Sequence, residues 1–137
     1  MLEKLKQDKH AISNEALRQY FPADRVIDGL FDLAGRLYGV SFSERTDVET
    51  WHEDARYFDV LGRDGNAIGG FYTDMYARNG KRTGAWIADC VNRKRLNGTT
   101  TLPVGFLVCN FSPPGDGEPS LLSHVEIVTL FHEFGHM

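Results

Sequence analysis

The feature that most constrains the fold is a series of apolar segments separated by Asp-Gly and Asn-Gly dipeptides. Four segments within residues 54–112 are rich in aromatic and β-branched residues, a composition that favours β-strands; they read "ARYFDVLG", "AIGGFYTDMY", "GAWIADCV" and "PVGFLVCNF". The dipeptides at 64–65, 79–80 and 97–98 tolerate the positive φ that tight hairpin turns require. The sequence therefore predicts an antiparallel β-meander over residues 54–112.

Three details refine this sheet. The run "VGFLVC" is almost continuously apolar, which is typical of a strand that is covered on both faces. Gly69-Gly70 lies inside a strand pattern and indicates a bulge or a close approach of another backbone. The segment "SPPGDGEP" is rich in proline and glycine, which predicts a loop.

Residues 13–53 are predicted to be helical, and residues 1–12 to be a tail or a helix end. Ser13 suits the cap of a short first helix, and Pro22 suits the first turn of a second helix that Gly39 can end. Apolar residues recur at helical spacing in the second helix, at Val26, Ile27, Leu30, Phe31, Ala34, Leu37 and Tyr38. Thr46–Glu49 is a possible capping box for one further helical turn.

The last segment, residues 122–137, is predicted to be a helix. Ser123 and Glu126 form a capping box just before an apolar run. At about 100° per residue, one arc of this helix collects Ile127, Val128, Leu130, Phe131 and Phe134. His132 and His136 lie on a different face, so the core side and the histidine side are separable. The predicted fold class is α+β, with N-terminal helices, an antiparallel β-meander and a C-terminal helix.

Composition excludes several classes of protein. The net charge of −4 argues against a general nucleic-acid binder. No run approaches the 18 or so apolar residues of a membrane helix, and the charged first ten residues are not a secretory signal. These features favour the cytoplasm, so we expect Cys90 and Cys109 to be reduced and packed as small apolar groups. Lys81-Arg82 and Arg93–Arg95 are expected on solvated turns or on a strand edge that they protect from aggregation.

The final helix carries the pattern H-E-x-x-H, from His132 to His136. Histidines at i and i+4 share one helix face, where both imidazoles reach one ion at about 2.0–2.1 Å. Glu133 is rotated by about 100° from His132, which suits a carboxylate that holds a water on the metal's open position. Zinc lowers the pKa of bound water toward about 7, and a carboxylate can then transfer its proton. The pattern predicts a zinc-dependent amide hydrolase with Glu133 as the general base.

A catalytic zinc usually has three protein ligands, and this pattern supplies only His132 and His136. The remaining histidines are His10, His52 and His124. Nothing in their spacing identifies any of them as the third ligand.

Longer stretches of the sequence resemble a known family. "FHEFGH", "GGFYTDMYARNGKRTGAW", "VCNFSPP" and "LLSHVEIVTLFHEFGH" resemble segments of the thimet oligopeptidase family of zinc metallopeptidases. The closest likeness is to its bacterial oligopeptidase A and dipeptidyl carboxypeptidase branch. The resemblance runs from about Ser13 to the end and is densest from Tyr57 onward.

The resemblance implies a cytosolic, mostly α-helical zincin-like peptidase that is several times longer and hydrolyses short peptides. His132 and His136 would bind one Zn²⁺ per complete active site, with Glu133 as the general base. The third ligand would be a Glu on a later helix. Residues 1–137 would then be a partial catalytic domain, inactive alone, whose partners are short peptides and the missing C-terminal part of the domain.

In zincins an edge strand pairs with the substrate backbone. Gly84-Ala85-Trp86 is a candidate for that edge, and the alternative is an ordinary hairpin strand with Trp86 in the core. Two further hypotheses stay open. One is a non-catalytic α+β module that binds a peptide or protein, and the other is a truncated product that self-associates through an exposed interface.

Overall fold

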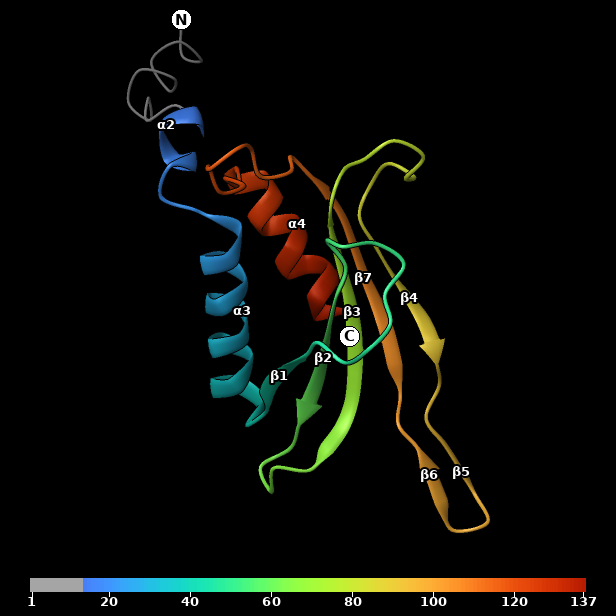
Figure 1. Ribbon diagram of the computed structural model, residues 1–137. Coiled ribbons are helices and arrows are strands. Elements are labelled where there is room, and N and C mark those ends of the chain that lie inside the picture. Colours follow the sequence, from blue (N-terminus) through green and yellow to red (C-terminus); the bar gives the residue numbers. More distant parts are fainter. Residues whose placement is uncertain (1–13) are drawn as a thin grey trace, which may run out of the picture.

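The computed structural model describes residues 14–137. Its helices and strands are α2 (Asn14–Arg18), α3 (Ala23–Tyr38), β1 (Ser41–Arg45), β2 (Arg56–Leu61), β3 (Ala67–Tyr76), β4 (Trp86–Val91), β5 (Lys94–Leu96), β6 (Thr99–Thr101), β7 (Val104–Phe111) and α4 (His124–Gly135). Helices α3 and α4 pack on one face of a five-stranded sheet, and the β5–β6 ribbon projects away from it (Figure 1). The predictions for residues 1–12 and Ser13 lie outside the described residues.

Helix α3 forms as its periodicity predicts. Pro22 is its N-cap, and Gly39 ends it in the left-handed conformation with φ 70°, where its N–H donates to the Gly35 carbonyl. The buried face includes Val26, Ile27 and Leu30. No helix in residues 14–137 is long and apolar enough to cross a membrane.

The prediction of helix through residues 13–53 is wrong for its last part. Ser41–Arg45 is strand β1, which pairs antiparallel with β2. The Phe42 ring stacks on Phe31 with centroids 4.3 Å apart, and this contact together with the strand pairing holds the segment extended. Residues 46–48 form a bend, in which Arg45 donates two hydrogen bonds to Asp47, and no helix begins at the capping box predicted for Thr46–Glu49.

The α+β class is confirmed, but the antiparallel meander is wrong. The strand order is β1-β2-β3-β7-β4, and β3 pairs with β7 in parallel. Within the described residues, strand β4 pairs only with β7 and forms one edge of the sheet. The apolar β7 takes the covered position between β3 and β4, as its composition predicts. Pairing both edges of this apolar strand, in which Leu107, Val108 and Cys109 are buried, outweighs the local preference of β3 and β4 for a hairpin.

The Gly and Asn turn signals have mixed outcomes. Asn97 and Gly98 have φ of 50° and 81° and form the tight β5–β6 hairpin. Gly80 has φ 81° but lies in the longer β3–β4 connection. The predicted irregularity at Gly69-Gly70 is confirmed by a register shift in the β2–β3 pair, and a Cβ on Gly70 would overlap the Tyr57 hydroxyl.

Lys81 does not lie on a solvated turn, which corrects the sequence prediction. Its side chain is 5% exposed. The ammonium group donates to the Asp74 carbonyl at 2.9 Å, the Asp74 carboxylate at 3.0 Å and the Tyr76 carbonyl at 2.8 Å. Arg82 and Arg93–Arg95 are exposed as predicted.

The Asp74 carboxylate is the centre of this buried cluster. Arg78 donates two hydrogen bonds to it, at 2.7 and 2.8 Å, and Trp51 Nε1 donates a third at 3.0 Å. Burial alone would raise the pKa of Asp74, but the hydrogen bonds from Arg78, Trp51 and Lys81 hold it well below its usual range. The cluster therefore fixes the β1–β2 and β3–β4 connections to the sheet.

The expectation of two packed cysteines holds for only one of them. Cys109 on β7 is buried in the core, and Cys90 on β4 is exposed. Cys90 lies near the end of the edge strand β4, where Asp89, Cys90 and Val91 are all exposed. The two thiols do not face each other, because Trp86, not Cys90, is the β4 residue that pairs near Cys109, opposite Val108.

Candidate metal centre

Helix α4 is fixed at its start by the predicted capping box. The Ser123 hydroxyl accepts from the Glu126 N–H at 3.3 Å, and the Glu126 carboxylate accepts from the Ser123 N–H at 2.7 Å. Leu130 is completely buried, and partly buried residues pack around it on the core side: Ile127, Phe131 and Phe134. Val128 is 53% exposed, so its assignment to the core arc is wrong. The arc of α4 that packs against the sheet and α3 is therefore narrower than the predicted one, and it is centred on Leu130.

Loss of this cap should destabilise the helix that carries the histidines. We expect Ser123→Ala to lower the free energy of unfolding by about 1 kcal/mol, because the Glu126 N–H loses its acceptor. Urea denaturation followed by circular dichroism measures this. Thr129→Ala is a suitable control, since its hydroxyl bonds only to the Val125 carbonyl on the exposed side of the same helix. If Ser123→Ala lowered the free energy of unfolding no more than Thr129→Ala does, the assignment of the cap would be contradicted.

The two motif histidines lie together on the exposed side of α4. Their Nε2 atoms are 3.1 Å apart, and the rings are nearly perpendicular with centroids separated by 4.7 Å. Both residues are exposed. Two nitrogen ligands at about 2.0–2.1 Å from a tetrahedral zinc ion lie about 3.3 Å apart. The observed 3.1 Å separation, which also allows a hydrogen bond between the two rings, is close to this value.

Glu133 lies beside the histidine pair and is partly exposed. Its side chain has no hydrogen bond or ion pair with residues 14–137, so both carboxylate oxygens can accept a proton or a water. Its backbone carbonyl accepts from the His136 N–H at 3.1 Å, which fixes the two residues relative to each other.

The described part of the chain supplies no third ligand to this pair. No group of three or more His, Cys, Asp or Glu side chains is placed to hold a metal there. His52 instead accepts from the Asp54 N–H, His124 is exposed at the start of α4, and His10 lies outside the described residues. Burial raises the pKa of the Cys109 thiol to about 12, so this nearby sulfur stays protonated at neutral pH.

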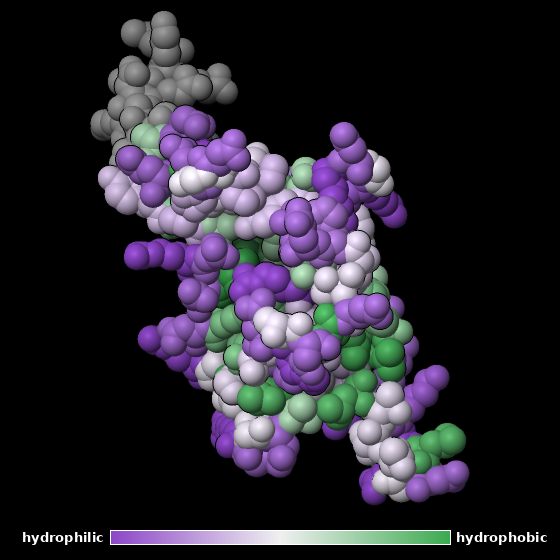
Figure 2. Space-filling model, viewed as in Figure 1, coloured by the Kyte–Doolittle hydropathy of each residue, from purple (hydrophilic) through white to green (hydrophobic). Residues whose placement is uncertain are grey.

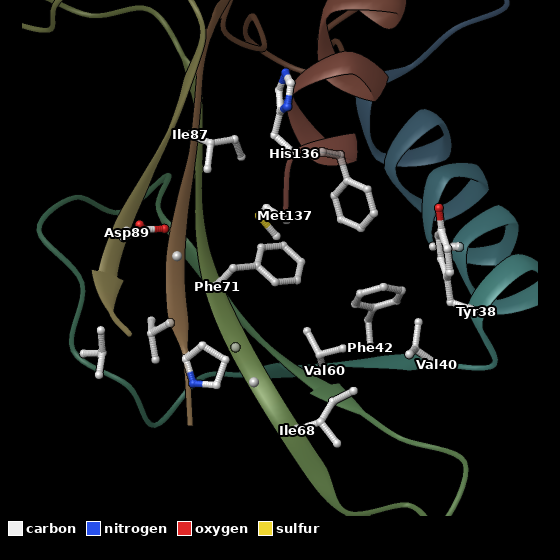
Figure 3. A pocket seen from close by; sticks show the side chains of 18 of the residues that line it. Tyr38, Val40, Phe42, Val60, Ile68, Phe71, Ile87, Asp89, His136 and Met137 are labelled. Carbon is white, nitrogen blue, oxygen red and sulfur yellow. The ribbon is translucent and has the colours of Figure 1, made fainter. Parts of the chain in front are cut away.

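A cavity of about 510 Å³ opens at the C-terminal end of α4. In Figure 3, Ile87 and Asp89 of β4 face it from one side and Tyr38 and Val40 from the other, with Met137 between them. Its lining is mostly apolar, and Figure 2 shows hydrophobic side chains gathered on the surface around this end of α4. An edge strand, a histidine pair and an apolar cavity are thus adjacent.

The edge strand differs slightly from the sequence prediction. Strand β4 begins at Trp86, so Gly84 and Ala85 precede it. Trp86 is half-buried on the face away from the helices, rather than in the core. Asn110 holds the segment before the strand through hydrogen bonds to the carbonyls of Arg82 and Gly84.

The buried Asp74 cluster is a feature that the sequence analysis does not predict. The sequence does contain a sign of this cluster. Asp74 interrupts a mostly apolar strand, and a buried carboxylate requires a cation nearby. Arg78 and Lys81 follow it within the same connection and provide the charge.

Comparison with known proteins places the chain among peptidases: a model of Peptidase family M3 matches residues 1–137, and the chain belongs to this family. It is 48% identical over 135 residues to Oligopeptidase A of Salmonella typhimurium and 50% identical over 135 residues to Oligopeptidase A of Haemophilus influenzae. It is 39% identical over 135 residues to a dipeptidyl carboxypeptidase of Salmonella typhimurium. The resemblance seen in the sequence is therefore confirmed.

The matches cover nearly all of this chain and a small part of each relative. Each of the three covers 98% of the chain and 20% of the relative's length. The chain thus spans about a fifth of the curated relatives that it matches.

Proposed function

We propose that this chain carries half of the zinc centre of a peptidase that hydrolyses short peptides. The observation that carries the proposal is the 3.1 Å separation of the His132 and His136 Nε2 atoms on an exposed helix face. In this proposal the two imidazoles are zinc ligands. Membership of Peptidase family M3 and the printed names of the relatives support peptide-bond hydrolysis as the reaction.

The chemistry is divided between the ion and the chain's own residues. A bound zinc ion would lower the pKa of water and polarise the peptide carbonyl. Glu133 follows His132 directly, and its unpaired carboxylate would take the proton from the attacking water and return it to the leaving amine. Capping at Ser123 and burial of Leu130 hold the helix backbone, so they fix the positions from which all three side chains extend.

The third ligand would come from another part of a longer protein. A catalytic zinc needs three protein ligands, and residues 14–137 bring only two together. The histidine face of α4 is exposed, so a further element can approach it. We expect no measurable peptide cleavage from this chain alone, because two ligands bind and activate the metal weakly.

Zinc titration tests the ligand assignment. We expect weak zinc binding by calorimetry at neutral pH, weakened about tenfold or more in His132→Ala and in His136→Ala, because each variant removes one of two ligands. His124→Ala is the matched control, since it removes an exposed histidine from the same helix. Equal affinity in all the variants would overturn the ligand assignment. Robust peptidase activity of the purified chain would show that a third ligand lies within it.

A further inference from the structure

The face of the sheet that α3 and α4 leave uncovered carries an aromatic layer. Strand register aligns Trp86, Val108 and Asp74 in one row across β4, β7 and β3. Ala88, Phe106 and Tyr72 form the next row. Trp51, from the β1–β2 connection, packs over the second row, with its ring centroid 5.2 Å from Tyr72 and 5.4 Å from Phe106.

A hollow of about 330 Å³ lies between Trp51 and Trp86. Its floor is apolar and includes Ala88, Phe106 and Val108. Trp51 is 50% exposed, although its Nε1 donates to the buried Asp74 carboxylate at 3.0 Å. This hydrogen bond and the contacts with Tyr72 and Phe106 hold the Trp51 ring in place beside the hollow. A large apolar side chain that stays exposed and is held rigidly is typical of a binding surface.

The charged groups around this hollow differ in whether they are paired. Asp74 is already neutralised by Arg78 and Lys81, and all three Lys81 N–H bonds are used within the cluster. Arg82 forms no ion pair with residues 14–137, and its guanidinium lies 5.7 Å from the Trp86 ring centroid. The rim of the hollow therefore carries an exposed cation that has no carboxylate partner among the described residues.

From this arrangement we infer that the hollow between Trp51 and Trp86 binds an acidic peptide segment. An apolar side chain of the segment enters over Ala88 and Val108, between the two indole rings. A carboxylate next to it in the sequence pairs with Arg82, which the Trp86 ring holds at the rim. The site lies on the opposite face of the sheet from the helix that carries the histidine pair, and no residue of that helix lines it.

The two tryptophans provide a direct readout, because Trp51 and Trp86 are the only ones in the chain. The probes are end-blocked peptides: Ac-Gly-Leu-Glu-Gly-NH₂, its Gln analogue, and Ac-Gly-Gly-Glu-Gly-NH₂, which lacks the apolar side chain. Titration with a chelator present separates this site from the histidine pair. We expect saturable fluorescence changes with the Leu-Glu peptide, about two- to fivefold weaker binding of the Leu-Gln peptide, and weaker binding still of the Gly-Glu peptide.

Variants locate the contacts. Arg82→Gln should make the Leu-Glu and Leu-Gln midpoints equal, and Arg95→Gln, an exposed arginine on the β5–β6 ribbon, should leave their ratio unchanged. Midpoints are compared rather than amplitudes, because Arg82 lies over Trp86. The proposal is overturned if no peptide perturbs the fluorescence, if the neutral peptide binds equally well to the unchanged chain, or if Arg82→Gln keeps the preference. Tighter binding of a single-stranded oligonucleotide than of the Leu-Glu peptide would also overturn the proposal, since the hollow would then bind stacked bases rather than a peptide.

Discussion

Replacing Asp74 with asparagine should lower the free energy of unfolding by about 3–5 kcal/mol, which is the usual cost of breaking a buried ion pair from one side. The substitution keeps the size of the side chain but leaves Lys81 without its counter-charge. Lys81 is 5% exposed and cannot reach water without displacing the β3–β4 connection. Urea denaturation at neutral pH, followed by circular dichroism, measures the loss.

The pH dependence of this loss gives a second check. The pKa of Asp74 is lowered in the folded chain, so its ionised form contributes stability above the unfolded pKa of about 3.9. That contribution disappears as the pH falls from there through the lower folded pKa. The difference between the unchanged chain and Asp74→Asn should therefore be constant near neutrality and shrink in acid.

Asp47→Asn is the matched control, because it removes a carboxylate from a pair with Arg45 that is exposed to solvent. Exposed pairs contribute little, so we expect no measurable change in stability. If Asp74→Asn were as mild as this control, the buried cluster would not be holding the two connections.

Phe71→Ala should also destabilise the chain by about 3–5 kcal/mol, as is usual for deleting a buried phenylalanine. Phe71 is completely buried on β3. Its ring contacts aromatic rings from four other elements, with centroid separations of 5.5–6.0 Å: Phe31 of α3, Phe42 of β1, Phe58 of β2 and Phe134 of α4. Its removal should weaken the packing of α4 against the sheet, so thermal unfolding should start at a lower temperature.

Tyr38→Ala serves as the control for Phe71→Ala. Tyr38 is 71% exposed at the end of α3, and alanine suits a helix, so little change is expected. Similar midpoints of unfolding for the two variants would show that Phe71 is not the centre of the aromatic cluster.

The parts of the fold that the sequence predicted correctly are governed by neighbours along the chain. Gly39 ends α3, Ser123 begins α4, and Asn97-Gly98 turns the β5–β6 hairpin, because caps and tight turns depend on a few adjacent residues. The histidine pair belongs to the same group, since i and i+4 spacing places two side chains together on any helix.

The predictions that failed depend on contacts between distant segments. Whether β7 pairs with β3 or with β4 cannot be decided from turn dipeptides, because β7 pairs with both. Phe42 makes β1 a strand through a ring in α3, and Lys81 is buried because Asp74 lies beside it on the sheet. A third metal ligand is likewise a question of tertiary structure, and spacing near His132 carries no information about it.

The parallel pairing of β3 with β7 has a consequence for how the chain folds. Strand β4 and the β5–β6 ribbon lie between these two strands in the sequence, yet β7 occupies the place next to β3 in the sheet. Closing such a long loop costs chain entropy before any pairing compensates for it, so native contacts of this kind form slowly. The β1–β2–β3 hairpins, with their short-range register, should assemble first, and the histidine helix, which packs against β7, should dock among the last elements.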